Sequence, residues 1–130
     1  MATGDGSGYT LSDFDLGWAV GMIEGEGHIS ATKRKDRARG WRVTIGVSSN
    51  DRTILTRLQG LFGGGIYRHS TNNSLANEPG YAWQISAIRE VQTILQLVYP
   101  HLSDRRKAQA DRALAVRPIY GPGGIGRGNG

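Results

Sequence analysis

The spacing of apolar residues changes along the chain, and each change predicts a new secondary-structure element. A helical period predicts a first helix over residues 13–24, with Thr10 or Ser12 as its N-cap. Its apolar face consists of Leu16, Ala19, Val20 and Ile23. The period then becomes two, which predicts a hairpin with one apolar face and one polar, basic face over residues 28–34 and 42–48.

The same succession repeats in the second half of the chain. A second helix is predicted over residues 51–61, capped by Asn50 or Ser49 and stopped by three consecutive glycines. Alternating residues over 66–70 and 81–86 predict a second hairpin, joined by a loop that contains Asn, Pro and Gly.

Two further helices are predicted after this hairpin. The first begins at Ser86 or Ala87 and ends before Pro100, since proline cannot continue a helix. The last helix is capped by Ser103 and reaches about Val116. The apolar spacing within both segments has the helical period.

The order α-β-β-α-β-β-α-α predicts an α+β fold, and 130 residues suit one domain, which we place at residues 11–118. The flanking segments 1–10 and 119–130 are rich in Gly and are expected to be disordered. The absence of Cys excludes disulfides and thiolate metal sites. No apolar run long enough to span a membrane and no secretion signal occur, so we expect an intracellular protein, in the cytoplasm of a prokaryote or in an organelle.

Charge is unevenly distributed along the chain. Residues 1–30 hold five acidic residues and no Lys or Arg, although the net charge of the protein is +5. All 16 Lys and Arg residues follow, against six acidic residues, so the remainder carries +10, and 13 of the 16 are Arg. Arg makes bidentate contacts to phosphate and to guanine. The balance therefore predicts a nucleic-acid partner, with a merely soluble basic protein as the alternative.

Residues 19–27 read Ala-Val-Gly-Met-Ile-Glu-Gly-Glu-Gly and combine an apolar helix with two closely spaced carboxylates. Glu24 and Glu26 lie where the predicted helix ends, and negative charge there opposes the helix dipole. Mg²⁺ prefers hard oxygen ligands, so a bound metal would account for both carboxylates. The alternative is a helix that ends in a solvated turn.

Three glycines recur every four residues in the same helix, at Gly17, Gly21 and Gly25. Glycine inside a helix costs about 1 kcal/mol relative to alanine. Small residues in register allow a second helix to approach closely. This face therefore predicts a partner helix.

Residues 16–27 resemble the signature helix of the LAGLIDADG homing endonucleases, and the predicted element order resembles the half-enzyme of that family. The resemblance implies a saddle-shaped sheet of four antiparallel strands, whose concave face lies in the DNA major groove and whose other face carries the helices. Two departures from the motif are visible. Both acids are Glu where Asp is commoner, and the motif opens with Ala-Val in place of Leu-Ala.

A single motif in this family implies a homodimer, because the motif helices of two half-enzymes pack together at a two-fold axis. On this reading, the interface includes Gly17, Val20, Gly21 and Glu24. A two-fold enzyme implies a pseudo-palindromic DNA site.

The resemblance implies a site-specific, double-strand endodeoxyribonuclease, a hydrolase of the intron-encoded, free-standing type. The last acid of the motif binds the metal in this family, so Glu26 and the Gly25 carbonyl are the expected ligands of Mg²⁺, for which Mn²⁺ or Ca²⁺ can substitute in binding. One alternative is an intron RNA maturase or a non-cleaving DNA- or RNA-binding protein of the same fold. Another is a small basic RNA-binding or ribosome-associated protein with a chance motif.

A basic residue usually stands near the cleavage site at the start of the last helix in this family. Residues 105–110 match the usual Lys-x-x-Gln-Ala pattern and place Arg106 at the Lys, with Arg105 and Lys107 as the other options. Arg cannot act as a general acid or base, because its pKa is above 12. It can still stabilise negative charge on a phosphate.

A polar residue at the end of the second strand usually lies near the water network of these enzymes. Ser48, Ser49 and Asn50 all match by position, and we take Ser49 as the candidate catalytic residue. The alternative role, which fits Asn50 best, is the N-cap of the second helix.

DNA contacts are expected from the polar face of both hairpins and from their turns. The expected residues are His28, Ser30, Thr32, Lys33, Arg34, Arg37, Arg39, Arg42, Thr44, Tyr67, Arg68, His69, Asn72 and Gln84. Trp83 shares a strand face with Tyr81 and Ile85 and is expected in the core.

Overall fold

The computed structural model describes residues 2–4, 9–33, 40–68 and 80–117. Within these residues the helices are α1 (Asp13–Glu26), α2 (Arg52–Phe62), α3 (Ile88–Val98) and α4 (Asp104–Leu114), with a 3₁₀ turn at Tyr99–His101. The strands are β1 (Ala2–Gly4), β2 (Thr10–Ser12), β3 (Gly27–Lys33), β4 (Trp41–Ser49), β5 (Gly65–Arg68) and β6 (Tyr81–Ile85). The predicted order α-β-β-α-β-β-α-α is therefore confirmed from α1 onward.

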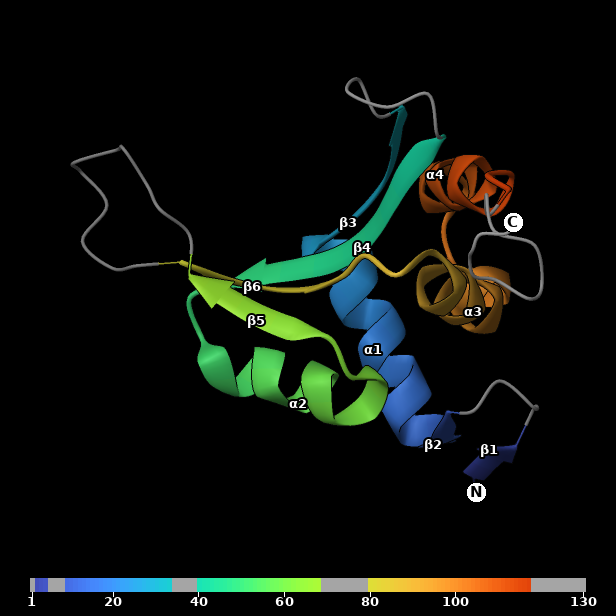
Figure 1. The fold of residues 1–130 in the computed structure, drawn as a ribbon. Coiled ribbons are helices and arrows are strands. Elements are labelled where there is room, and N and C mark those ends of the chain that lie inside the picture. Colours follow the sequence, from blue (N-terminus) through green and yellow to red (C-terminus); the bar gives the residue numbers. More distant parts are fainter. Residues whose placement is uncertain (1, 5–8, 34–39, 69–79, 118–130) are drawn as a thin grey trace.

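The four strands after α1 form one antiparallel sheet in the order β3-β4-β6-β5. The two hairpins, β3–β4 and β5–β6, are thus joined by pairing between their second strands, β4 and β6. The sheet bends, with β3 and β4 rising steeply while β5 and β6 run across it, and α1 and α2 lie below it (Figure 1). This is the four-stranded α+β architecture that the sequence predicted.

The core lies between the helices and one face of the sheet. Val43, Ile45 and Val47 of the central strand β4 are buried, and Trp83 of β6 is fully buried beside them, as predicted. The Trp83 indole N–H donates to the Gly63 carbonyl at 2.7 Å, which satisfies its only polar atom. Helices α1, α2 and α3 supply the apolar side chains that cover this face: Ala19, Ile23, Leu55, Leu58, Val91, Ile94 and Leu95.

Several boundaries differ from the sequence prediction by one or two residues. Helix α1 continues to Glu26 instead of ending near Glu24, because the Gly27 N–H still bonds the Ile23 carbonyl as its cap. Helix α4 ends at Leu114 instead of Val116. The N-cap of α2 is Asp51, whose side chain accepts from the Thr53 N–H, so the prediction of Asn50 or Ser49 was wrong.

The N-terminal segment also differs from the prediction. Strand β1 pairs with β2, so that Thr3 lies opposite Leu11. Leu11 is buried, whereas the Gly-rich sequence around β1 has no apolar alternation that would predict a strand. Residues 119–130, expected to be disordered, lie outside the described part of the chain.

Candidate functional site

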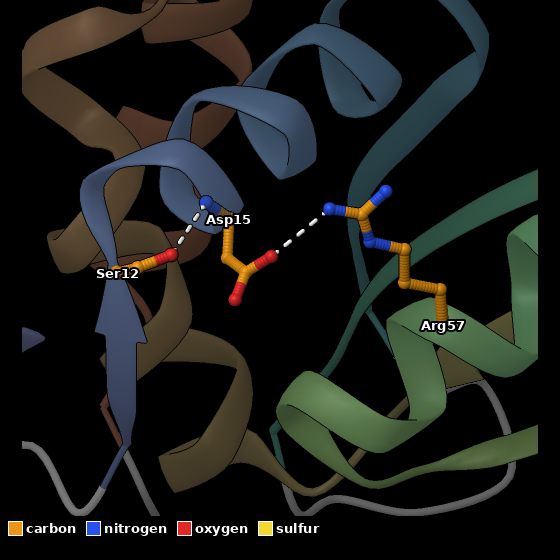
Figure 2. Close-up of polar contacts among 3 residues, drawn as sticks. All are labelled: Ser12, Asp15 and Arg57. Carbon is orange, nitrogen blue, oxygen red and sulfur yellow. Dashed lines mark hydrogen bonds and ion pairs between the residues drawn. The ribbon is translucent and has the colours of Figure 1, made fainter.

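Helix α1 is held at its N-terminal end by polar contacts that the structure shows directly. The Ser12 hydroxyl accepts from the Asp15 N–H at 3.0 Å, which confirms Ser12 as the N-cap. The Asp15 carboxylate pairs with the Arg57 guanidinium of α2 at 2.9 Å (Figure 2). Arg57 also lies over the Trp18 ring, 4.1 Å from its centre. These contacts fix the start of α1 against α2.

The C-terminal end of α1 carries the two glutamates and no basic residue in its last turn. Glu24 is half-buried, and its carboxylate accepts from the Ser103 N–H at 2.5 Å. Glu26, the last residue of the helix, is exposed and makes no hydrogen bond or ion pair within the described residues. A Cβ on Gly27 would lie 2.5 Å from the Ile23 carbonyl oxygen, so only glycine fits where the chain leaves the helix.

Of the three predicted basic residues, the structure brings Arg106 to this end of α1. Its Nη2 donates to the Glu24 backbone carbonyl at 3.2 Å, and its Nη1 donates to the Gln109 side-chain oxygen at 2.9 Å. Arg106 is only 5% exposed, and burial lowers the pKa of its guanidinium, with the Arg105 charge adding to this effect and Glu24 opposing it. Arg105 is exposed, and Lys107 lies 5.4 Å from the Tyr99 ring centre.

The structure places the candidates Ser48 and Ser49 on opposite faces of the sheet. The strand register pairs Ser49 with Tyr81, two residues from the Val47–Trp83 pair, so it belongs to the helix-covered face of the sheet. Its hydroxyl accepts from the Asp51 N–H at 3.0 Å, which shapes the approach to α2. Ser48, the neighbouring alternative, lies on the opposite face across from Ala82.

The face of the sheet opposite the helices is here called the polar face. Its described residues are His28, Ser30, Thr32, Arg42, Thr44, Gly46, Ser48, Gly65, Tyr67, Ala82 and Gln84. None of these described residues is Asp or Glu, so a polyanion would meet no negative side chain among them.

Exposure varies among the predicted DNA-binding residues of the polar face. Thr32 and Arg42 are exposed opposite each other, and Tyr67 is 58% exposed. Thr44, in contrast, is 6% exposed, because it is a short side chain in the middle of a central strand. Its predicted DNA contact is therefore not supported by this arrangement.

Two glycines shape the remaining part of the polar face. A Cβ on Gly46 would lie 2.5 Å from the His28 ring, so this ring lies across Gly46. A Cβ on Gly65 would lie 2.5 Å from the Tyr67 hydroxyl. The Gln84 side-chain amide donates to the Ser86 hydroxyl at 3.4 Å. His28 and Tyr67 thus sit on the face with their rings laid over glycines.

Two predicted DNA-binding residues fall on the other face. Lys33 pairs with Trp41 and Arg68 pairs with Tyr81, both in the register of the helix-covered residues. Both side chains are exposed at strand ends, so they border the sheet and do not line its polar face. The predictions for Arg34, Arg37, Arg39, His69 and Asn72 lie outside the described residues.

The glycines of α1 form an uncovered surface. Gly17, Gly21 and Gly25 are exposed, and a Cβ built on any of them would meet nothing within 4 Å. Val20, also predicted at a dimer interface, is half-buried and packs against the core. Nothing in the described chain therefore explains the glycine spacing.

In the described ranges, no three His, Cys, Asp or Glu residues come together to hold a metal ion. One chain therefore offers the Glu26 carboxylate and backbone carbonyls of the last turn of α1, which lack partners within the helix itself. Among the same ranges no helix has the length and apolar character needed to cross a membrane.

The contacts that join α1 to other elements could not be predicted from the sequence. The bond from Ser103 to Glu24 links residues 79 positions apart, and the Arg57–Asp15 pair links residues 42 positions apart. No periodicity connects such positions. The one sequence feature that pointed to such contacts was the pair Glu24 and Glu26, because two carboxylates at the C-terminal end of a helix oppose its dipole and need a positively charged or hydrogen-bonding partner.

No family model matches the chain, and no curated protein matches it in sequence. The fold, however, is that of the LAGLIDADG homing endonucleases. The homing endonuclease I-CvuI, solved with its DNA target and Ca²⁺, is 23% identical with a TM-score of 0.61; the match covers 78% of this chain and 64% of I-CvuI.

Two further solved structures share the fold. The group I intron-encoded homing endonuclease I-CeuI, complexed with DNA, is 16% identical with a TM-score of 0.62, covering 81% of this chain and 54% of I-CeuI. The LAGLIDADG homing endonuclease I-GzeII, in complex with a DNA target, is 16% identical with a TM-score of 0.53, covering 75% of this chain and 32% of I-GzeII. The chain thus spans less than two thirds of each of these proteins, and at these identities the likeness establishes the fold.

Proposed function

We propose that this protein is a homodimeric, site-specific DNA endonuclease that hydrolyses both strands of a long pseudo-palindromic site with Mg²⁺. The observation that carries the proposal is Glu26, an exposed carboxylate without a partner in the described chain, at the end of α1 beside an acid-free polar face. The solved structures of I-CvuI, I-CeuI and I-GzeII are homing endonucleases in complex with their targets or with DNA, which supports the same class of activity here.

The polar face is suited to duplex DNA. A two-stranded ribbon fits the major groove, where Arg pairs with guanine and Gln with adenine. Arg42 and Thr32 sit opposite each other in the first hairpin, and Gln84 lies across from Gly46 in the middle of the sheet. These side chains would read base edges. The exposed Lys33 and Arg68 at the strand ends would contact phosphates, which position the duplex without specifying its sequence.

The glycine surface of α1 fits a second copy of the chain. Eight consecutive residues from Leu16 to Ile23 are apolar or glycine, so no side of this helix is polar there. A helix that is apolar all round is normally buried, yet Gly17 and Gly21 are exposed in the single chain. Packing of α1 against its two-fold copy would cover this surface and bring the two Glu26 residues near one axis.

The residues at the end of α1 fit a divalent metal. Glu26 and the Gly25 carbonyl would hold the ion, and their oxygens are the hard ligands that Mg²⁺ prefers. The bound metal supplies an activated water and neutralises charge on the phosphate. I-CvuI has been solved with DNA in the presence of Ca²⁺ and, with the DNA not cleaved, in the presence of Mg²⁺, which is consistent with divalent metal use. Mn²⁺ or Ca²⁺ would substitute in binding.

Ser48 replaces Ser49 as the polar residue proposed near the reacting water. Of the two serines, Ser48 lies on the polar face, two residues along β4 from Gly46, which pairs with His28 of β3. As a DNA endonuclease, the protein would act where DNA lies, and we place it in the cytoplasm of a prokaryote or in an organelle.

The proposal is tested by selecting duplexes from a randomised library with the protein in Ca²⁺ and cloning the recovered site into a supercoiled plasmid. Incubation with Mg²⁺ should yield linear plasmid, whereas EDTA should prevent cleavage. Selective duplex binding without Mg²⁺-dependent linearisation would identify a non-cleaving DNA-binding protein instead. Preferential capture of a structured intron RNA over every duplex would identify a maturase. Either result contradicts the nuclease.

A further inference from the structure

Glu24 and Arg106 join the end of α1 to the start of α4 through two hydrogen bonds that are both donated from α4 to Glu24 and are here called the α1–α4 clasp. The Glu24 carboxylate accepts from the backbone N–H of Ser103, the N-cap of α4. The Arg106 Nη2 donates to the backbone carbonyl of Glu24 at 3.2 Å. Each bond therefore uses a side chain of one helix and a backbone group of the other.

Both backbone groups are ones that helix ends leave without a partner inside the helix. In a capping box the acidic or amide residue at the third helical position bonds the N-cap N–H. In α4 this position is Arg106, which has no acceptor, and Glu24 of α1 takes its place. At the other end, Arg106 supplies the cation that the last turn of α1 lacks.

The surroundings of Arg106 favour a fixed position over contact with a phosphate. The side chain is 5% exposed, and its Nη1 is held by Gln109 at 2.9 Å one turn further along α4. Its Nε is buried without a hydrogen-bond partner among the described residues. The folded state therefore already includes the desolvation free energy of the guanidinium. A guanidinium this deeply buried acts on the end of α1, which it contacts, and not on a phosphate outside the fold.

We propose that Arg106 is a positioning residue: through the Glu24 carbonyl it fixes the last turn of α1, and so the direction in which Glu26 presents its carboxylate to the metal. The proposal rests on the proposed function, since it needs Glu26 as a metal ligand. It assigns Arg106 no proton transfer and no contact with the scissile phosphate. A residue that orients a metal ligand typically contributes a factor of about 10–100 in metal affinity or activity.

The test compares Arg106→Met with Arg112→Met in the full chain. Arg112 is exposed near the end of the same helix, so its variant removes equal charge away from the clasp. In Arg106→Met the Mg²⁺ concentration for half-maximal cleavage should rise about tenfold or more, while KM for DNA stays within about twofold. Arg112→Met should leave both within about twofold. A fall in kcat at saturating Mg²⁺ with unchanged half-saturation would overturn the proposal, because Arg106 would then act on the phosphate.

A double-mutant cycle covers the case in which Arg106→Met folds poorly. Glu24→Ala removes the other half of the clasp and should raise the Mg²⁺ requirement similarly. The double variant should be little worse than either single variant, since both break one unit. If the two substitutions raise the Mg²⁺ requirement independently, so that their effects multiply in the double variant, the clasp is not one unit and the proposal is overturned.

Amide hydrogen exchange of residues 24–28 separates failure of this proposal from failure of the nuclease proposal. It needs neither DNA nor metal. Faster exchange in Arg106→Met and unchanged exchange in Arg112→Met support the clasp even if the wild type cleaves no DNA. Equal exchange in both variants overturns it even if the wild type is a nuclease.

Discussion

The two ends of α1 use their charged residues in opposite ways. At the N-terminal end, Ser12 and Asp15 complement the helix dipole, and the Asp15 carboxylate is paired with Arg57. At the C-terminal end, Glu24 and Glu26 oppose the dipole, and only Glu24 finds partners in the described chain. At the N-terminal end the Asp15 carboxylate is paired, whereas at the C-terminal end the Glu26 carboxylate is exposed and has no partner in the described chain.

This difference separates residues whose contacts stabilise the fold from residues that the fold alone does not explain. Helix capping explains Ser12, and the ion pair between α1 and α2 explains Asp15 and Arg57. They do not explain Glu26, and they do not explain three glycines whose surface meets nothing in the chain. Both unexplained features lie along α1, and the proposed second copy with a shared metal would account for both.

The largest expected effect is at Glu26. Glu26→Gln keeps the size of the side chain but removes a charged metal ligand, so Mg²⁺-dependent cleavage should fall at least about 100-fold. DNA binding in the absence of metal should be retained. The matched control is Asp15→Asn at the other end of α1, which should cleave at the wild-type rate. Cleavage by Glu26→Gln at a rate close to that of Asp15→Asn would remove Glu26 from the site.

The glycine surface gives the next largest effect. Gly21→Ala should raise the dimer dissociation constant, because the added methyl group lies where the partner helix must approach. In dilute, dissociated protein the same change should stabilise the fold by about 1 kcal/mol, since alanine favours a helix over glycine. Sedimentation equilibrium and urea unfolding measure the two quantities.

Gly60→Ala is the control for that prediction. Gly60 lies inside α2, and a Cβ there also meets nothing within 4 Å. This variant should stabilise the fold by a similar amount and leave the dissociation constant unchanged. If Gly21→Ala and Gly60→Ala behave alike, the dimer does not form through α1.

A smaller effect is expected at Arg57. Arg57→Met removes the cation over the Trp18 ring and the partly exposed pair with Asp15. The free energy of unfolding should fall by about 1–2 kcal/mol, with most of the loss from the ring contact. Urea unfolding measures this loss. A loss that disappears entirely in high salt would assign it to the ion pair alone.

The smallest effect is expected at the helix cap. Ser12→Ala removes the hydroxyl that accepts from the Asp15 N–H, and should lower the free energy of unfolding by about 1 kcal/mol or less. Ser12→Asp restores an acceptor and should recover most of that loss. An unchanged stability in Ser12→Ala would mean that the β1–β2 ribbon, not the cap, fixes the start of α1.

The element order and the core followed from local patterns, because each apolar stripe is set within one helix or strand. Trp83 and the face of β4 that carries Val43, Ile45 and Val47 were predicted for this reason. Arg106 was placed near the end of α1 through the resemblance. Its burial could not be predicted, since it depends on Gln109 and on a backbone carbonyl 82 residues away.

Two positions were hard to predict because neighbouring residues offer the same chemistry there: the N-cap of α2, which was predicted wrongly, and the polar residue at the end of β4. Ser48, Ser49 and Asn50 are all short and polar, and only the register with β6 separates Ser48 from Ser49. Asp51 is the N-cap of α2 in place of its neighbours, because it directly precedes the first helical residue. Thr44 alternates with the core residues of β4, so its place on the polar face could be predicted. Its burial could not, because it depends on the strands at either side.

Anomalous diffraction from crystals of the protein with its selected duplex and Mn²⁺ tests the central claim most directly. We expect density for the metal at the two-fold axis, with the Glu26 carboxylates of both copies within about 2.0–2.2 Å of it, as is usual for oxygen ligands of such ions. Metal ligated by other side chains, or α1 helices that do not touch each other, would contradict it.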